Sequence, residues 1–224
     1  MPLNLINLQK TKYKPTWDIQ KNLVKRRADG KIDDCLIVTE HEPVITMGRA
    51  TDYDNLLVDK EDLRKKGVDL HEIERGGDIT FHGPGQIVLY PIINLRKRGR
   101  DVHQYLRDLE EFTITALIDI GLEASVKEGL TGIWVDNYKI GAIGVAVSRW
   151  ITYHGIAINV TTDLDYFKLI NPCGITEYPV GSLSQLLGKD VNMEQVNKLL
   201  VRNFADFFGY KNVKAIDEIN SLII

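Results

Sequence analysis

The sequence has only two cysteines and none of the residue spacings that hold metals. Cys35 and Cys173 stand far apart with no CxxC pair, and the five histidines show no metal-like spacing with acidic or cysteine partners. The chain therefore predicts neither a zinc centre nor a disulfide framework, and we expect no metal. Two isolated thiols suit a reducing compartment, so we expect a cytoplasmic protein.

Excess positive charge and long apolar runs are also missing. The formal net charge is −3, which leaves no basic surplus for binding nucleic acid. The N-terminal residues lack the charged-then-apolar form of a signal peptide, and no apolar run approaches the roughly 18 residues that span a membrane. We therefore expect neither a nucleic-acid partner nor a membrane partner.

The common nucleotide and hydrolase motifs are absent as well. The sequence contains no GxxxxGK[ST] phosphate loop, no GxGxxG fingerprint, no GxSxG elbow and no HExxH helix. Phosphate, nicotinamide and zinc chemistry are therefore unsupported, and we expect no cofactor. A nucleophile that works without a metal remains possible.

The composition provides enough apolar residues for a core. Of the 224 residues, 44% are hydrophobic and 26% are charged, a length that suits one large domain or two small ones. No repeat or long linker divides the chain, so we expect a single domain over residues 1–224. Helices and strands do not alternate regularly, which favours an α/β fold of the α+β type, with a mixed or antiparallel sheet and helices around it.

Local patterns predict the elements. Capping residues and apolar periodicity indicate helices at 16–28, from Asp59 to Gly67, at 103–120, after Asp163, from Ser182 to Gly188 and from Asn192 to Phe208. Alternating or continuous apolar runs indicate two strands within 35–48, broken at Pro43, and further strands at 79–82, 87–93, 133–135, 139–147 and 151–160.

The densest concentration of glycine lies in residues 75–86, which read RGGDITFHGPGQ. This segment holds four of the eighteen glycines and one of the five histidines. Glycine on both sides of a short strand lets a ligand lie against bare backbone, with Arg75 and His82 as polar groups at the two ends. The structural alternative is a tight hairpin with glycine turns, and composition alone does not choose between the two.

The same segment resembles the RGGxxT[YF]HGPGQ signature of the lipoyl(octanoyl) transferases, the acyltransferases of protein lipoylation. Further segments resemble the same family: residues 40–48 match its EHxPVxTxG pattern, residues 139–144 match KI[AG]AIG, residues 171–174 match its NPCG loop, and residues 154–159, HGIAIN, resemble its HG[FLI]ALN strand. Phe81 stands where tyrosine is common in the family. Within this pattern we interpret His41 as a hydrogen-bonded residue at a strand end rather than a catalytic one.

The resemblance implies a fold shared with biotin and lipoate protein ligases. It implies an octanoyltransferase that moves an octanoyl or lipoyl group from acyl carrier protein to a lysine of lipoyl-carrier domains, in 2-oxoacid dehydrogenase complexes and in the glycine cleavage H protein. An acyl thioester is already activated, so the reaction needs no ATP. Two alternatives remain: an ATP-dependent lipoate ligase of the same fold, and a non-catalytic scaffold that binds carrier proteins.

Two residues gain catalytic roles from the resemblance. Alone, Cys173 would be interpreted as a small buried hydrophobe and Lys139 as a solvated strand end, as their types usually are. The resemblance makes Cys173 the acyl-accepting nucleophile and Lys139 its partner. Cys35 opens an apolar strand and is expected to be buried and inert. Whether His82 or His154 assists stays open.

The remaining predictions concern binding. The acyl chain is expected to lie against three glycine-containing segments, whose residues are Arg75, Gly76, Gly77, Asp78, Ile79, Thr80, Phe81, His82, Ala142, Ile143, Gly144, Gly155, Ile156 and Ala157. The densest basic run, residues 96–100, is a candidate docking site for acidic carrier proteins, although a solvated loop explains it equally well.

Overall fold

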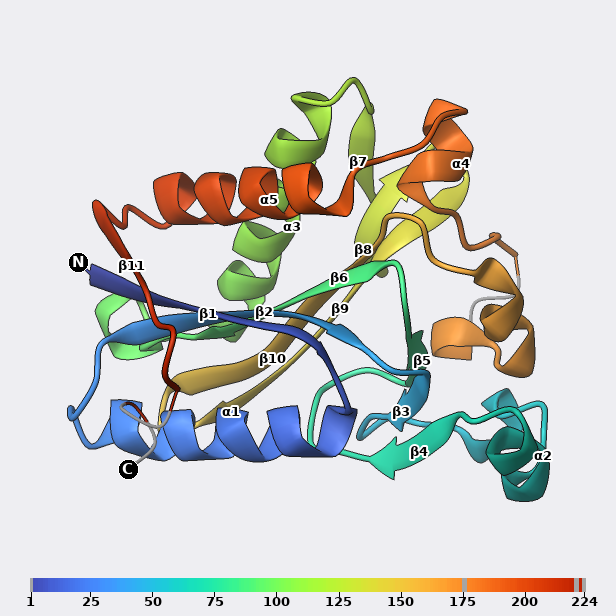
Figure 1. Ribbon diagram of the computed structural model, residues 1–224, viewed down its shortest axis with the longest axis horizontal. Coiled ribbons are helices and arrows are strands. Elements are labelled where there is room, and N and C mark those ends of the chain that lie inside the picture. The colour runs from blue at the N-terminus through green and yellow to red at the C-terminus, as the bar shows by residue number, and fades with distance from the viewer. Residues whose placement is uncertain (1, 175–176, 220–221, 223–224) are drawn as a thin grey trace.

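An eight-stranded mixed sheet forms the centre of the fold (Figure 1). The computed structural model describes residues 2–174, 177–219 and 222, and of Cys173 it describes the backbone but not the side chain. In spatial order its strands are β11 (Asn212–Ala215), β1 (Pro2–Thr11), β2 (Asp34–His41), β6 (Gln86–Ile92), β10 (Ile151–Asn159), β9 (Tyr138–Ser148), β8 (Leu130–Val135) and β7 (Ala124–Lys127). Strand β1 pairs in parallel with β2 and with β11, and the other neighbours are antiparallel.

A second, smaller sheet packs beside one end of the first. Its order is β4 (Asp69–Glu72), β3 (Val44–Met47) and β5 (Ile79–His82), with β3 parallel to β4 and antiparallel to β5. The hairpin alternative for residues 75–86 is therefore wrong, because β5 and β6 belong to different sheets. The chain passes between the sheets at residues 83–85, where Gly85 has a φ of +80° and a Cβ would lie 2.7 Å from Thr161.

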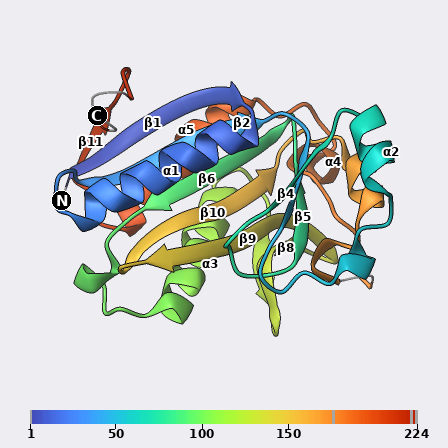
Figure 2. The ribbon, with the colours of Figure 1, turned by 90° about the horizontal axis from the view of Figure 1, so that it is seen from below.

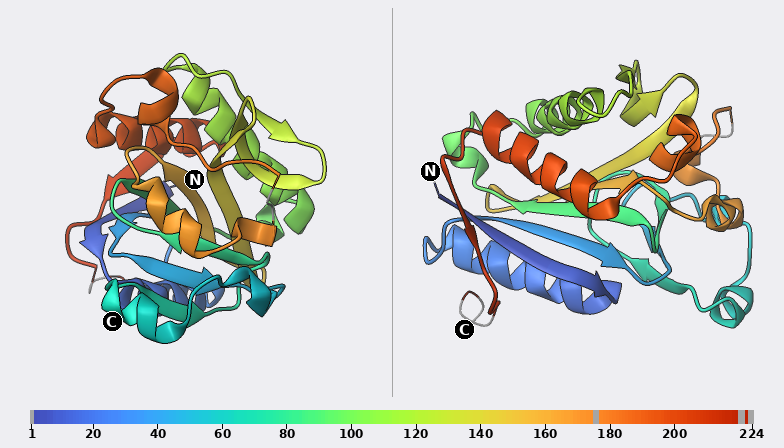
Figure 3. Two further views of the ribbon diagram at one scale, coloured as in Figure 1. Left: turned by 90° about the vertical axis from the view of Figure 1, so that its right-hand side faces the viewer. Right: turned by 45° about the horizontal axis from the view of Figure 1, so that its top comes forward.

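Helices cover both faces of the main sheet. Helix α1 (Tyr13–Ala28) lies along one face, and α3 (Val102–Ile118) and α5 (Met193–Phe207) lie on the other (Figures 1 and 2). The left panel of Figure 3 shows the same layers from one side, and the right panel shows them with the top of Figure 1 tilted toward the viewer. The shorter helices are α2 (Lys60–Lys65) and α4 (Leu183–Leu187), and the 3₁₀ segments are η1 (Tyr53–Asn55), η2 (Leu95–Lys97), η3 (Leu164–Leu169) and η4 (Pro172–Gly174). No helix among the described residues is long and apolar enough to cross a membrane.

Alternation along the strands fills a separate core on each face of the sheet. On β2, Leu36 and Val38 pack toward α3 and α5, and Cys35 and Ile37 pack toward α1. A third apolar cluster lies under the small sheet, with side chains from β3, β5, α2 and η3. Burial on both faces explains why the central strands read as continuous apolar runs in the sequence.

The predicted helix starts are confirmed by their caps. The side chain of each capping residue accepts a hydrogen bond from a backbone N–H two or three residues further on, at Asp59, Asp101, Asp163, Ser182 and Asn192. Helix α1 begins at Tyr13, three residues before the predicted start at Thr16. The sequence patterns did not reveal strands β1, β4, β7 and β11, which lie at or next to sheet edges.

Candidate active site

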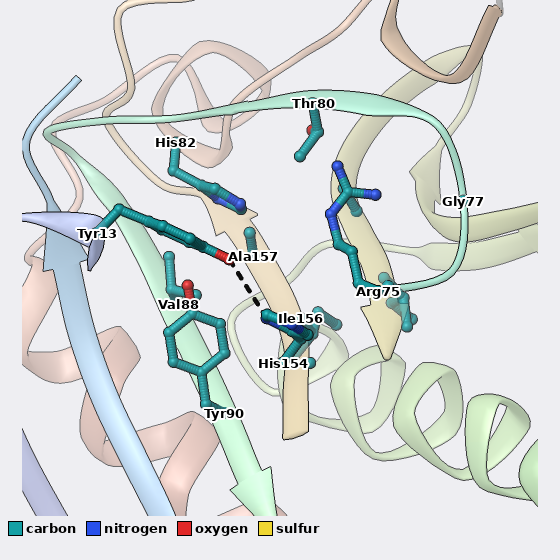
Figure 4. A pocket seen from close by; sticks show the side chains of 14 residues that line it. Tyr13, Arg75, Gly77, Thr80, His82, Val88, Tyr90, His154, Ile156 and Ala157 are labelled. Carbon is teal, nitrogen blue, oxygen red and sulfur yellow. Dashed lines mark hydrogen bonds between the residues drawn. The ribbon is translucent and has the colours of Figure 1, made fainter. Parts of the chain in front are cut away.

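A cavity lies between the main sheet and the RGG segment (residues 75–82) (Figure 4). The structure brings the three predicted glycine-containing segments together around it, because β9 and β10 are neighbours and the RGG segment crosses them. The predicted residues that line it are Arg75, Gly77, Thr80, His82, Ala142, Ile143, Gly144, Gly155, Ile156 and Ala157.

Strand β5 contributes only alternate residues to the cavity. Thr80 and His82 line it, and Ile79 and Phe81 point to the other side of the strand, into the core under the small sheet. The Phe81 ring stacks on Tyr166 with 4.8 Å between ring centroids. The phenylalanine that stands where tyrosine is common in the family is therefore a core residue, away from the cavity.

The other two predicted residues of the RGG segment are not among the lining residues. The backbone N–H of Gly76 donates to the carbonyl oxygen of Val145 at 2.9 Å, which ties the segment to β9. The carboxylate of Asp78 accepts from the side-chain amide of Asn55 at 2.6 Å and from the backbone N–H of Ile79 at 2.7 Å. These contacts indicate that Gly76 and Asp78 hold the segment in place.

Glycines let the RGG segment and the sheet approach each other closely. Gly144 pairs with Gly155 across β9 and β10. A Cβ at Gly155 would lie 2.2 Å from the carbonyl oxygen of Leu89, and one at Gly144 would lie 2.9 Å from Cδ of Arg75. Side chains at these two positions would therefore collide with the strand β6 backbone and with the cavity wall.

The Arg75 guanidinium is buried in that wall. One terminal nitrogen donates to the carbonyl oxygen of Thr46 at 2.7 Å and to the hydroxyl of Thr46 at 3.1 Å, and the other donates to the carbonyl oxygen of Gly76 at 3.1 Å. The side chain is 7% exposed. Arg75 thus links strand β3 to the RGG segment and places a fixed positive charge beside the cavity.

Four lining residues were missed as binding residues in the sequence, and three of them are polar: Tyr13, Tyr90 and His154. The fourth is Val88. The hydroxyl of Tyr13 lies 3.3 Å from Nδ1 of His154, and the hydroxyl of Tyr90 lies 2.8 Å from Nε2 of His41. Tyr13 stands at the start of α1, far from the motifs in the chain, so no local signal marked it. The contacts of His41 confirm that it is a buried, hydrogen-bonded residue at the end of β2.

Burial keeps the three histidines of this region neutral. Removal from water lowers the pKa of His41 to about 4 and the pKa of His154 to about 3. The pKa of His82 is lowered to about 3, by burial first and then by the neighbouring His41. At neutral pH the cavity is therefore lined by uncharged imidazoles and phenols on one side and by the Arg75 cation on the other (Figure 4).

His154 also has an unusual backbone. Its φ is +56°, a conformation that non-glycine residues seldom adopt in a strand, and its N–H donates to the side-chain oxygen of buried Gln20 at 2.7 Å. Such strain persists where the surroundings hold it, and it concentrates at functional sites. The orientation of this imidazole is therefore set by its backbone and by the contact of Nδ1 with the Tyr13 hydroxyl.

Lys139 lies at the start of β9, three residues before the first lining residue of that strand. It is only 6% exposed, so the interpretation as a solvated strand end is wrong. Its backbone N–H donates to Pro179 at 2.9 Å and its carbonyl oxygen accepts from Gly181 at 3.0 Å. Its Nζ lies 5.6 Å from the centre of the Trp134 ring, within the range of a cation–π contact.

Gly132 makes room for the Lys139 side chain, a role that the sequence patterns did not reveal. A Cβ at this position would lie 2.8 Å from Cε of Lys139 and 2.7 Å from the carbonyl oxygen of Gly141. The backbone N–H of Gly132 donates to the buried carboxylate of Glu110 at 3.0 Å. Glu110 on α3 therefore holds in place the glycine against which the lysine rests.

The cysteine loop (residues 171–174) packs against η1 and β5. The backbone N–H of Asn171 donates to the carbonyl oxygen of Asn55 at 2.8 Å, and that of Gly174 donates to Asn171 at 3.1 Å. A Cβ on Gly174 would lie 3.8 Å from the carboxylate of Asp78. The side chain of Cys173 lies outside the described part of the structure, so the predicted pairing with Lys139 stays a prediction.

Cys35 is the buried, inert thiol that the sequence predicts. It is fully buried in β2, and burial raises the pKa of its thiol to about 12. The basic run at residues 96–100 follows Asn94, which bridges to Ile151 at the start of β10. The other end of β10 is Asn159, whose side-chain amide donates to the carbonyl oxygen of Gly181. Within the run, Arg98 donates to the carbonyl oxygen of Phe208 at 2.8 Å.

Comparisons with known proteins decide the family. The model of the lipoyl protein ligase A/B catalytic domain matches residues 12–205. The chain belongs to this family. An octanoyltransferase of Koribacter versatilis is 45% identical over 99% of this chain and 90% of its own length. An octanoyltransferase of Thermoanaerobacter sp. is 49% identical over 88% of this chain and 86% of its own length.

Solved structures of the lipoyl ligase family and of a biotin ligase share the fold. A lipoate-protein ligase A bound with ATP superimposes with a TM-score of 0.77 at 19% identity, over 100% of this chain and 93% of its own. A biotin protein ligase from Aquifex aeolicus superimposes with a TM-score of 0.51 at 15% identity, over 93% of this chain and 72% of its own. The predicted fold class is thereby confirmed. No group of three or more His, Cys, Asp or Glu side chains that could hold a metal occurs among the described residues.

Proposed function

We propose that this member of the octanoyltransferases moves the octanoyl group in two steps, through a thioester on Cys173, with Lys139 as the partner of that cysteine. Octanoyl transfer in protein lipoylation follows from the octanoyltransferases that match most of the chain at 45% and 49% identity. The two-step route and the residues that carry it are the proposal. Splitting one difficult transfer into two easier ones is the usual advantage of a covalent intermediate.

In the first step, the Cys173 thiolate attacks the carbonyl carbon of the donor thioester. The bond from that carbon to the donor sulfur breaks, and the donor leaves as a thiol after taking up a proton. In the second step, the amine of an acceptor lysine attacks the same carbon. The bond to Cys173 breaks, an amide forms, and the cysteine leaves as a thiolate. The surplus proton of the amine passes to Lys139, which has given up its own ammonium proton to the solvent after the first step.

The observation that carries the proposal is the position of Lys139. It is buried at the start of β9, the same strand whose residues 142–144 line the cavity, and its backbone is bonded to residues 179 and 181, which follow the cysteine loop. A lysine ammonium close to a cysteine stabilises the thiolate, and a neutral lysine amine can accept a proton from the incoming amine. We propose the cavity that residues 142–144 line as the binding site of the acyl chain.

The partners follow from the same proposal. A lipoyl-carrier domain is the acceptor, and we propose those of the 2-oxoacid dehydrogenase complexes and the glycine cleavage H protein. The bi-partite lipoate protein ligase of Thermoplasma acidophilum, which shares the fold, was studied together with its E2 lipoyl domain. Acyl carrier protein is the proposed donor. We place the enzyme in the cytoplasm, where a catalytic thiol stays reduced.

The experiment is a transfer assay with octanoyl acyl carrier protein and a purified lipoyl domain, without ATP. The proposal predicts an octanoyl amide on the acceptor lysine in the absence of any nucleotide. An ATP-dependent ligase would instead require ATP and free octanoate, and a scaffold would bind the carrier without turnover. Transfer that appears only when ATP and free acid are present would overturn the proposal.

A further inference from the structure

Strand β9 presents its residues alternately to the two faces of the main sheet, which α1 covers on one side and α3 and α5 on the other (Figure 1). Ala142 and Gly144 line the cavity, and Val145 packs in the core that faces α3 and α5. If this alternation continued to the start of the strand, Lys139 would point into that apolar core and Ile140 would point to the cavity face.

The structure has the reverse arrangement. Ile140 is fully buried in the core that faces α3 and α5. Lys139 pairs with Trp134 on β8, and its Nζ lies 5.6 Å from the centre of the Trp134 ring. Trp134 stands between Ile133 and Val135, which both belong to the core toward α3 and α5. The indole and the lysine therefore share the other face, which is the cavity face.

A β-bulge in β9 causes this change of face. Ile133 on β8 lies opposite Gly141, and the next residue of β8 lies opposite Lys139. Residues 140 and 141 of β9 therefore oppose a single residue of β8. Both face the same core, because a Cβ at Gly141 would lie 2.7 Å from Cδ1 of Ile158, a member of that core. The extra residue turns Lys139 from the core to the cavity face.

Glu110 on α3 binds the backbone where the pairing of β8 with β9 begins. Ile133 is the first residue of β8 that pairs with β9, and Gly132 precedes it with a φ of +143°, a conformation that favours glycine. The N–H of Gly132 donates to Oε1 of Glu110 at 3.0 Å. This N–H is thus directed out of the sheet toward α3, and the regular ladder stops beside the bulge.

The Glu110 carboxylate is buried, and it has one charged partner. Its Oε2 accepts from Nη1 of Arg107 at 2.6 Å, and the Arg107 side chain is half exposed. A carboxylate in a core is costly, and a well-packed apolar residue usually stabilises a fold as much or more. What Glu110 adds is therefore the bond to Gly132, which an apolar side chain would not make.

We infer that Glu110 is a positioning residue for Lys139. Its carboxylate holds Gly132 outside the β8–β9 ladder, this contact fixes the bulge at residues 140–141, and the bulge directs the lysine to the cavity face. Without the contact, α3 no longer holds Gly132, and Lys139 loses its fixed direction. The inference rests on the proposed function, in which Lys139 assists both steps.

Three substitutions at Glu110 separate geometry from charge. Glu110→Gln keeps an oxygen that can accept from Gly132, and the half-exposed Arg107 can turn to the solvent. Glu110→Asp keeps the charge but withdraws the oxygen by one carbon–carbon bond, and Glu110→Met removes the acceptor. The matched control on the same helix is Thr113→Val, because the buried Thr113 hydroxyl donates within α3, to the carbonyl oxygen of Leu109 at 2.8 Å.

The first measurement is kcat for octanoyl transfer, taken well below the Tm of each variant. We expect Glu110→Met and Glu110→Asp to lower kcat by about 10²-fold, the effect of a displacement of about 1 Å at a reacting group. Glu110→Gln should lower kcat by about fivefold or less, because the neutral acceptor remains. Thr113→Val should stay close to wild type. A higher kcat in Glu110→Asp than in Glu110→Gln would show that charge matters and position does not, and would refute the inference.

A double-mutant cycle separates positioning from a general loss of stability. In a Lys139→Ala background, Glu110→Met should lower Tm as it does in the wild type but should not reduce the transfer rate further, because the residue through which Glu110 acts is gone. If the two substitutions multiply their effects on the rate, Glu110 does not act through the lysine and the inference is wrong.

Labelling of Lys139 with an amine-reactive ester, followed by peptide mapping, tests the same contact without turnover. Burial of Lys139 makes its labelling slow in the wild type. We expect Glu110→Met to speed this labelling about tenfold, which corresponds to the loss of one hydrogen bond, and Thr113→Val to leave it unchanged. Unchanged labelling in Glu110→Met would refute the positioning role. Faster labelling together with wild-type transfer by Lys139→Ala would overturn the proposed function and leave the positioning of the lysine supported.

Discussion

Gly144 controls the position of Arg75, and this makes Gly144→Ala an informative substitution. The new Cβ would lie 2.9 Å from Cδ of Arg75 and 3.1 Å from the carbonyl oxygen of Gly76. The φ of Gly144 is outside the left-handed region, so alanine fits the backbone. The strain therefore falls on the Arg75 side chain, the more flexible of the two neighbours.

The magnitude follows from the bonds that Arg75 makes. Its guanidinium donates to Thr46 at 2.7 Å and 3.1 Å, and weakening one such buried, charge-assisted bond costs about 1.5–3 kcal/mol. For a chain of this size, that lowers Tm by roughly 3–12 °C. Arg75 and Gly144 both line the cavity, so their displacement narrows it. Each chain CH₂ that loses its contacts costs about 0.8 kcal/mol, or roughly fourfold in kcat/KM.

The assay measures Tm and kcat/KM for hexanoyl and octanoyl donors. We expect Gly144→Ala to be less stable and to shift the preference toward the shorter chain. The matched control is Gly76→Ala in the same motif, where a Cβ would meet only the carbonyl oxygen of Val145, at an ordinary 3.6 Å. Gly76→Ala should stay close to wild type. Equal effects of the two substitutions, or an unchanged chain-length preference in Gly144→Ala, would refute the argument.

Three further predictions test other parts of the site. Lys139→Arg keeps the positive charge but removes the group that can accept a proton. Cys173 should therefore still be acylated by the donor, and transfer to the acceptor should slow by about 10²–10⁴-fold in single-turnover assays. Equal slowing of both steps would contradict this prediction. Gly132→Ala should reduce transfer and Tm together, since a Cβ there would lie 2.8 Å from the Lys139 side chain and 2.7 Å from the carbonyl oxygen of Gly141; wild-type kinetics would show that the lysine needs no such space. The free energy of unfolding should be greatest above pH 6.5 and should fall as the pH drops toward 4. In this range the histidines of the unfolded chain take up protons, and the buried imidazoles of His41, His82 and His154 in the folded protein do not. Each of the three should therefore lower the free energy of unfolding by about 1.4 kcal/mol per pH unit. In denaturant titrations at several pH values, His82→Gln should reduce that slope, and an unchanged slope would contradict the prediction.

Local sequence signals predicted the elements that begin at a capping residue or end at a proline. The capping residues Asp101 and Asn192 sit where helices begin, and the break at Pro43 separates two strands. The motif segments came together as expected because β9 and β10 form an antiparallel pair joined by a tight turn at Arg149 and Trp150.

Features that depend on contacts between distant parts of the chain were not predictable from one sequence. Strand β5 reads like the first half of a hairpin with β6, yet it pairs with β3, and nothing within 75–86 specifies that partner. Strand β11 is four exposed residues that pair with the first strand. Tyr13 enters the site only because α1 packs under β6 and β10, and Gly132 matters only through the side chain of Lys139.

The measurement that tests the central claim most directly is the intact mass of the protein after incubation with octanoyl acyl carrier protein and no acceptor. The account predicts a gain of one octanoyl group, located on Cys173 by peptide mapping, that disappears when a lipoyl domain is added. It also predicts no such adduct and no transfer in Cys173→Ser. Transfer at a near-normal rate by Cys173→Ser, with no acylated intermediate, would contradict the account.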